Sequence, residues 1–160
     1  MSEQFEVAEL VQVGVEDEKT GVAFYAALSK KMKSPHLQKL FANLSEQERY
    51  HQKRFEQMLA ELGGLKPGHE EYPGQYMAYL RTLTNDRAFP DEETAMLAAQ
   101  TCASDAAAVE LATRYERDTL MLMNEMRNLV PEKDKPVVDE LAREEQVHLV
   151  MLSEARRKML

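Results

Sequence analysis

The pattern Glu-x-x-His occurs twice in the sequence, at residues 48–51 and again at residues 145–148. Both copies lie in long segments whose apolar residues recur at helical spacing. Residues three positions apart share one face of an α-helix, so each copy can present a carboxylate and an imidazole to a common point. The same faces carry apolar residues such as Leu44 and Leu141. The pattern therefore predicts ionisable groups that point into a helical core.

The two copies belong to a longer internal repeat. Glu18 and Glu116 occupy corresponding places in the preceding segments and are offset by 98 residues, while the two histidines are offset by 97. Apolar neighbours keep the same register, which pairs Phe24 with Leu122, Tyr25 with Met123, and Leu28 with Met126. The repeat predicts two helical hairpins that carry the same Glu…Glu-x-x-His pattern.

Four long amphipathic helices are expected to account for most of the chain. The apolar spacing and the capping residues place them at residues 4–32, 35–62, 104–129 and 134–159. Residues 63–90 hold four of the six glycines and three of the six prolines, which is typical of a long connection. Short helices are expected at about 72–83 and 91–100. The chain is thus predicted to be one all-α domain, residues 1–160, with two antiparallel helix pairs joined by a long crossover into a four-helix bundle.

Composition excludes several classes of protein and partner. A formal net charge of −8 repels phosphate backbones, so a nucleic-acid partner is not expected. Cys102 is the single cysteine, which rules out an internal disulfide and any Cys-x-x-Cys motif. No apolar stretch approaches the roughly 20 residues that span a bilayer, and no signal-peptide pattern is present. We therefore expect a cytoplasmic protein with no membrane partner.

The residue types of the repeat fit a dinuclear metal site. Two divalent ions carry four positive charges, which four carboxylates balance, and one histidine per ion supplies a nitrogen ligand. Without such a balance, carboxylates on an apolar face would be costly to bury. Oxygen-rich sites with two imidazoles suit iron or manganese, and zinc can occupy them. The predicted ligands are Glu18, Glu48, His51, Glu116, Glu145 and His148.

Three further polar residues lie near this pattern. Tyr25 follows Glu18 by two helical turns on the same face. Its hydroxyl could hydrogen-bond a ligating carboxylate, or the ring could be an ordinary core aromatic; the sequence supports both interpretations equally. Asp105 and Glu110 could line an entry path for iron, but solvated surface charge is the favoured interpretation.

At these residues the sequence resembles the rubrerythrin-like branch of the ferritin-like superfamily. Residues 18–25, Glu-Lys-Thr-Gly-Val-Ala-Phe-Tyr, are similar to the first-helix pattern of that family. The two Glu-x-x-His copies and residues 116–119 complete the resemblance, which spans about residues 5–158. It implies a ferritin-like bundle with two non-haem iron ions that react with hydrogen peroxide or dioxygen. It also implies a homodimer and a role in oxidative stress.

Two departures from the family pattern bear on function. Rubrerythrins proper append a rubredoxin domain with paired Cys-x-x-Cys motifs, whereas this chain has none and would need an external, rubredoxin-like electron donor. They also carry an extra glutamate three residues after the first glutamate of the third helix, where this chain has Thr119. That glutamate takes part in the ligand change linked to rapid peroxide reduction. Its absence leaves the efficiency of peroxide reduction open.

Three functions compete on this basis. The first is a di-iron oxidoreductase that reduces hydrogen peroxide or dioxygen. The second is an iron-handling ferroxidase or iron-binding protein. Only 12 residues follow His148, and the fourth helix uses them, so a small dimer is expected instead of a storage cage. The third is a helical interaction module in which the metal is structural.

Overall fold

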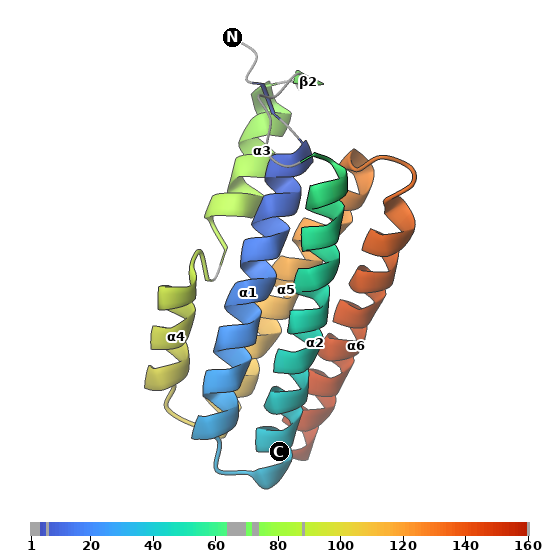
Figure 1. Cartoon of the computed structure of the whole chain (residues 1–160). Helices are drawn as coiled ribbons and strands as arrows, with labels where there is room; N and C mark the ends of the chain where they lie inside the picture. The colour runs from blue at the N-terminus through green and yellow to red at the C-terminus, as the bar shows by residue number, and fades with distance from the viewer. Residues whose placement is uncertain (1–3, 6, 64–69, 72–73, 88, 160) are drawn as a thin grey trace.

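The computed structural model describes residues 4–5, 7–63, 70–71, 74–87 and 89–159 (Figure 1). Within these residues the chain forms helices and one pair of very short strands. The strands are β1 (Gln4–Phe5) and β2 (Glu70–Glu71). The helices are α1 (Val7–Lys31), α2 (Pro35–Glu61), α3 (Gly74–Asn85), α4 (Glu92–Thr101), α5 (Asp105–Leu129) and α6 (Lys135–Lys158).

The four long helices form a bundle, as predicted. Helices α1 and α2 make one antiparallel hairpin, and α5 and α6 make the other (Figure 1). The hairpins pack face to face, with α1 against α5 and α2 against α6. This arrangement confirms the predicted all-α bundle with two helix pairs and a long crossover.

Capping residues set several helix ends where the sequence predicts them. The Ser34 side chain accepts a hydrogen bond from the Leu37 amide at 3.4 Å, and Pro35 occupies the first turn of α2. Gly63 has a φ of 84°, the left-handed conformation that commonly ends a helix. Ser104 caps α5 through the Ala107 amide at 3.1 Å. These local contacts explain why the expected and observed limits of the long helices agree closely.

The start of the first helix was predicted wrongly. The expected helix began at residue 4, but α1 begins at Val7. Gln4 and Phe5 instead pair with Glu71 and Glu70 in the antiparallel strands. Backbone pairing with a segment more than sixty residues away therefore replaces the helical pattern at this end.

The crossover packs on both hairpins, with α3 against α5 and α4 against α1, and its helix limits differ slightly from expectation. Helix α3 spans residues 74–85 instead of 72–83; residues 72 and 73 lie outside the described part of the chain. Helix α4 packs against α1, and its small buried residues Ala95 and Ala99 permit close approach (Figure 1). Phe89, just before α4, packs against Phe24 of α1, with ring centroids 4.7 Å apart. None of the described helices is long and apolar enough to cross a membrane.

The apolar core of the bundle is divided into two clusters. One surrounds Phe24, Phe41 and Tyr115, towards the turn between α1 and α2. The other surrounds Phe55 and Met126, towards the opposite end. On each long helix the glutamates and histidines of the repeat fall between these clusters. The fold therefore encloses a charged layer between two apolar layers.

Candidate metal centre

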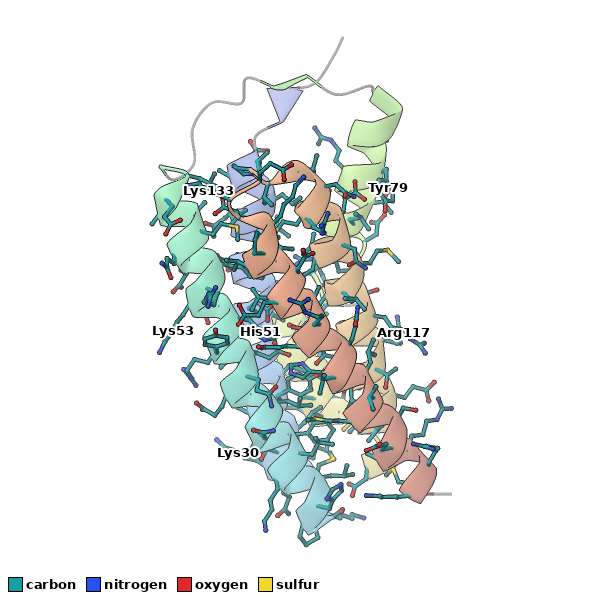
Figure 2. The ribbon with its side chains drawn as sticks, turned by 90° about the vertical axis from the view of Figure 1, so that its right-hand side faces the viewer. Lys30, His51, Lys53, Tyr79, Arg117 and Lys133 are labelled. Carbon is teal, nitrogen blue, oxygen red and sulfur yellow. The ribbon has the colours of Figure 1, made fainter. Side chains whose placement is uncertain are left out.

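The charged layer is fully enclosed by the bundle. Each of the four long helices contributes one or two of its side chains, and Figure 2 shows His51 midway along the bundle. All six predicted ligand side chains have 0% exposure: Glu18, Glu48, His51, Glu116, Glu145 and His148. The structure thus brings the whole predicted set together. That these residues bind metal stays a prediction.

The six side chains fall into two overlapping groups. In each group, one nitrogen or oxygen from every member lies within 4.8 Å of those of the others. Glu48 and Glu145 belong to both groups. One group adds Glu18 and His51, and the other adds Glu116 and His148. This is the arrangement needed for two ions that share two bridging carboxylates and have one further carboxylate and one imidazole each.

Both imidazoles point the same nitrogen at the carboxylates. His51 Nδ1 lies 2.7 Å from Glu145 Oε1 and 3.1 Å from Glu48 Oε2. His148 Nδ1 lies 3.0 Å from Glu145 Oε2. The two rings stack at 14° with centroids 5.6 Å apart. Nδ1 is therefore the atom that each ring offers to the centre of the cluster.

Many polar atoms of the cluster have no hydrogen-bond partner among the described residues. They include both oxygens of Glu18 and both oxygens of Glu48. Glu145 Oε1 and His51 Nδ1 are also unpaired, because their 2.7 Å contact lacks hydrogen-bond geometry. Buried carboxylate oxygens without partners are costly. Their convergence fits the donor set that divalent cations require, so these residues fit a two-metal centre.

Each histidine is held from behind by a residue of the opposite hairpin. His51 Nε2 donates to Glu144 Oε2 at 2.6 Å, and His148 Nε2 donates to Gln47 Oε1 at 2.7 Å. Protonation of Nε2 leaves Nδ1 free to act as a ligand. Neither partner was predicted from the sequence. The available signal was the repeat itself, since Gln47 and Glu144 stand directly before its equivalent glutamates.

Tyr25 contacts the cluster directly. Its hydroxyl donates a short hydrogen bond to Glu116 Oε1, across from α1 to α5. The ring also stacks on Phe41 in the apolar layer, with centroids 5.8 Å apart. Both interpretations left open by the sequence therefore apply, since the ring is a core aromatic and its hydroxyl orients a cluster carboxylate.

A second buried polar network borders the cluster and was not predicted. Asp17 is 3% exposed and pairs with Arg87 Nη1 at 2.9 Å. The Thr119 hydroxyl donates to the Asp17 carboxylate at 2.6 Å, and the Tyr115 hydroxyl donates to the Asp17 carbonyl at 2.7 Å. This network joins the crossover to α1 and α5 one residue away from Glu18. In this network the Thr119 side chain is hydrogen-bonded to Asp17.

Gly21 allows this network and the cluster to pack together. A Cβ atom at this position would lie 2.3 Å from the Tyr115 hydroxyl oxygen and 3.1 Å from Glu48 Cγ. The first distance is far inside van der Waals contact. A glycine at this point of α1 is therefore required for Tyr115 to reach the Asp17 carbonyl.

Burial and mutual repulsion change the pKa values of the cluster. Burial and the charge of Glu145 raise the pKa of Glu116 to about 8, and burial with Glu48 raises the pKa of Glu18 well above its usual value. Burial opposes the charged form of His51, but contacts with Glu145, Glu18 and Glu48 outweigh it and raise the pKa of this imidazole. The pKa of His148 is raised in the same way. In the absence of metal, protons therefore balance part of the carboxylate charge.

Metal binding is expected to release these protons and to weaken as the pH falls. Below pH 8, Glu116 holds a proton that a cation must displace, so affinity should fall at least about tenfold per pH unit between pH 8 and pH 6. Calorimetric titration with Zn²⁺ in two buffers of different ionisation enthalpy counts the protons released. An affinity independent of pH, with no proton release, would contradict this account of the cluster.

The structure places the other two acidic candidates outside the cluster. Asp105 accepts hydrogen bonds from the backbone amides of Lys33 and Ser34 at 3.1 and 3.0 Å. It therefore fastens the start of α5 to the turn between α1 and α2. Glu110 is exposed on α5. Neither position supports an entry path for metal.

Comparisons with known proteins agree with this geometry. The family model for rubrerythrin matches residues 9–156. No match was found among curated protein sequences. A solved structure from Thermotoga maritima, assigned to the ferritin-like diiron-carboxylate proteins, superposes with a TM-score of 0.67 and 21% identity. The superposition covers 100% of both chains. At this identity the likeness supports the fold.

Proposed function

The chain belongs to the rubrerythrin family, and from this premise we propose that it is a non-haem di-iron oxidoreductase that reduces hydrogen peroxide or dioxygen. One observation carries the proposal. Four glutamates and two histidines with 0% exposure converge in two groups that share Glu48 and Glu145. A purely structural core would not gather unpaired carboxylate oxygens in this way.

The residues have distinct roles in such a centre. Glu48 and Glu145 would bridge the two ions, while Glu18 with His51 and Glu116 with His148 would each complete one position. When bound, two ferrous ions supply the two electrons that convert one hydrogen peroxide and two protons into two water molecules. The apolar layers on either side exclude water from the reaction. Tyr25 holds a proton at its hydroxyl, directed at Glu116.

The Thr119 contact favours a second candidate function. Because its hydroxyl bonds to Asp17, the described part of α5 supplies Glu116 alone to the cluster. The family's redox-linked ligand change uses a glutamate at the position of Thr119, so peroxide reduction by this chain would proceed without that ligand change. Oxidation of ferrous iron by dioxygen, as in an iron-handling ferroxidase, is then the alternative.

The proposed activity has requirements beyond this chain. Re-reduction of the two ions needs an external electron donor, for which a rubredoxin-like protein is the proposed class. A homodimer and a cytoplasmic location complete the proposal. Sedimentation of the purified protein tests the dimer.

An anaerobic titration with ferrous iron tests the function. We expect saturation at two irons per chain, followed by a near-ultraviolet band of an oxo-bridged diferric pair after one equivalent of hydrogen peroxide. Faster oxidation by peroxide than by dioxygen would support the peroxidase. The reverse order would support the ferroxidase. Binding of metal without any change of oxidation state would contradict both and would leave a structural metal.

A further inference from the structure

The two histidines of the cluster are held by partners of different charge. The partner of His51 is the Glu144 carboxylate, at 2.6 Å from Nε2. The partner of His148 is the Gln47 amide oxygen, at 2.7 Å. Gln47 and Glu144 are equivalent positions of the internal repeat, so the two contacts have the same geometry and differ in chemistry. One imidazole donates to an anion, and the other donates to a neutral group.

The terminal carboxylates differ as well. Glu116 Oε1 accepts a hydrogen bond from the Tyr25 hydroxyl, whereas neither oxygen of Glu18 has a hydrogen-bond partner among the described residues. The repeat explains the difference, because the position equivalent to Tyr25 is Met123, which has no hydroxyl to donate. When both carboxylates are ionised, the hydrogen bond from Tyr25 takes up part of the charge of Glu116, and no described residue does so at Glu18.

Both differences act in the same direction. A carboxylate behind an imidazole increases the basicity of the opposite nitrogen more than an amide does, because the hydrogen bond is charge-assisted. A hydrogen bond to a ligand carboxylate withdraws charge from it. The position of His51 and Glu18 therefore offers a cation more negative charge than the position of His148 and Glu116.

We propose that the two positions bind divalent metal unequally, and that the position of His51 and Glu18 fills first because Glu144 supports His51. The proposal rests on the metal centre of the proposed function. Glu144 is a positioning residue in this scheme, since it acts through His51 and is not a ligand itself. Its side chain is 37% exposed, so it can be replaced without opening the core.

Nuclear magnetic resonance of the histidine rings tests the order of filling. The chain has four histidines, so ¹⁵N-labelled histidine gives few ring signals, which can be assigned individually. Zn²⁺ is the probe because it is diamagnetic. Partners behind metal-bound histidines change affinity by about 10- to 100-fold; with a tenfold difference, one equivalent of Zn²⁺ occupies about three quarters of the His51 rings and one quarter of the His148 rings.

Two variants show whether Glu144 causes the order. Glu144→Gln should narrow the difference between the two occupancies, because both histidines then donate to an amide and the Tyr25 contact alone still distinguishes the two positions. The exchange variant Gln47→Glu with Glu144→Gln keeps the net charge of the protein and should shift occupancy from His51 towards His148 by more than Glu144→Gln alone. Glu140→Gln is the matched control. This residue lies one turn earlier on α6 and contacts Arg54 instead of a histidine, so its loss should leave the order unchanged.

Each result decides the proposal. Equal responses of the two rings in the unmodified protein would overturn unequal binding, and a difference in occupancy that Glu144→Gln does not reduce would overturn the role of Glu144. Zn²⁺ that shifts neither ring would instead contradict the metal centre itself. The two failures are therefore distinguishable in a single titration. Circular dichroism of each variant without metal verifies that the helices are intact.

Discussion

Replacement of Glu48 by glutamine is expected to abolish binding at both metal positions together. Glu48 belongs to both ligand groups, and both of its oxygens lack hydrogen-bond partners in the described structure. Loss of a partner behind a ligand costs about 10- to 100-fold in affinity, so loss of a shared ligand charge should cost more than about 100-fold. Calorimetric titration with Zn²⁺ measures both the affinity and the stoichiometry.

The appropriate control is Glu46→Gln on the same helix. Its side chain is 71% exposed and contacts Arg49 at the surface, so this variant removes the same formal charge without touching the cluster. We expect unchanged stoichiometry and an affinity within about twofold, because exposed charges at this distance are screened by salt. Retention of two ions by Glu48→Gln would show that the ligand set is wrong.

Replacement of Arg87 by methionine is expected to lower the free energy of unfolding by about 3 kcal/mol, since removal of one partner leaves the other charge buried. Arg87 pairs with Asp17 at 2.9 Å, and the two side chains are 10% and 3% exposed. Urea denaturation of the metal-free protein at pH 8 measures the loss. Arg114→Met, at an exposed position on α5, should change stability by less than about 0.5 kcal/mol.

The pH dependence of the stability lost in Arg87→Met tests whether the unpaired charge of Asp17 causes that loss. Burial raises the pKa of Asp17 to about 6 even though Arg87 lowers it. Without Arg87 the pKa should rise further, so below pH 5 the carboxyl is neutral and the missing cation matters less. We therefore expect the Arg87→Met deficit to shrink between pH 8 and pH 5. The double variant Asp17→Asn with Arg87→Met should be more stable at pH 8 than Arg87→Met alone.

Local sequence patterns predicted the bundle and the six cluster residues because helical periodicity is a local property. Glu48 and His51 share a helix face with apolar residues, and this alone indicates that they are buried. The internal repeat then identified Glu18 and Glu116, which stand at matching places on the other two helices. Each of these inferences uses either residues within a few helical turns of one another or the fixed spacing between the two copies of the repeat.

The missed residues depend on contacts between helices. Gln47 and Glu144 are each one position from a cluster glutamate, so they point about 100° away from it around their own helix. Only the packing of α2 against α6 aims them at the opposite histidine. Arg87 lies in the crossover, 70 residues from Asp17, and no periodicity links these two residues. The strand pairing of Gln4 and Phe5 was missed for the same reason.

The contacts behind the cluster always cross between the two halves of the chain. His51, in the first half, is hydrogen-bonded to Glu144 of the second half. In the second half, Glu116 is hydrogen-bonded to Tyr25 and His148 to Gln47, and both of these partners come from the first half. Two identical copies of one hairpin would have to give both groups of the cluster the same surroundings. A single chain with two halves is free of this constraint. Divergence in either half can therefore change the surroundings of the cluster residues in the other half, while the cluster residues themselves remain unchanged.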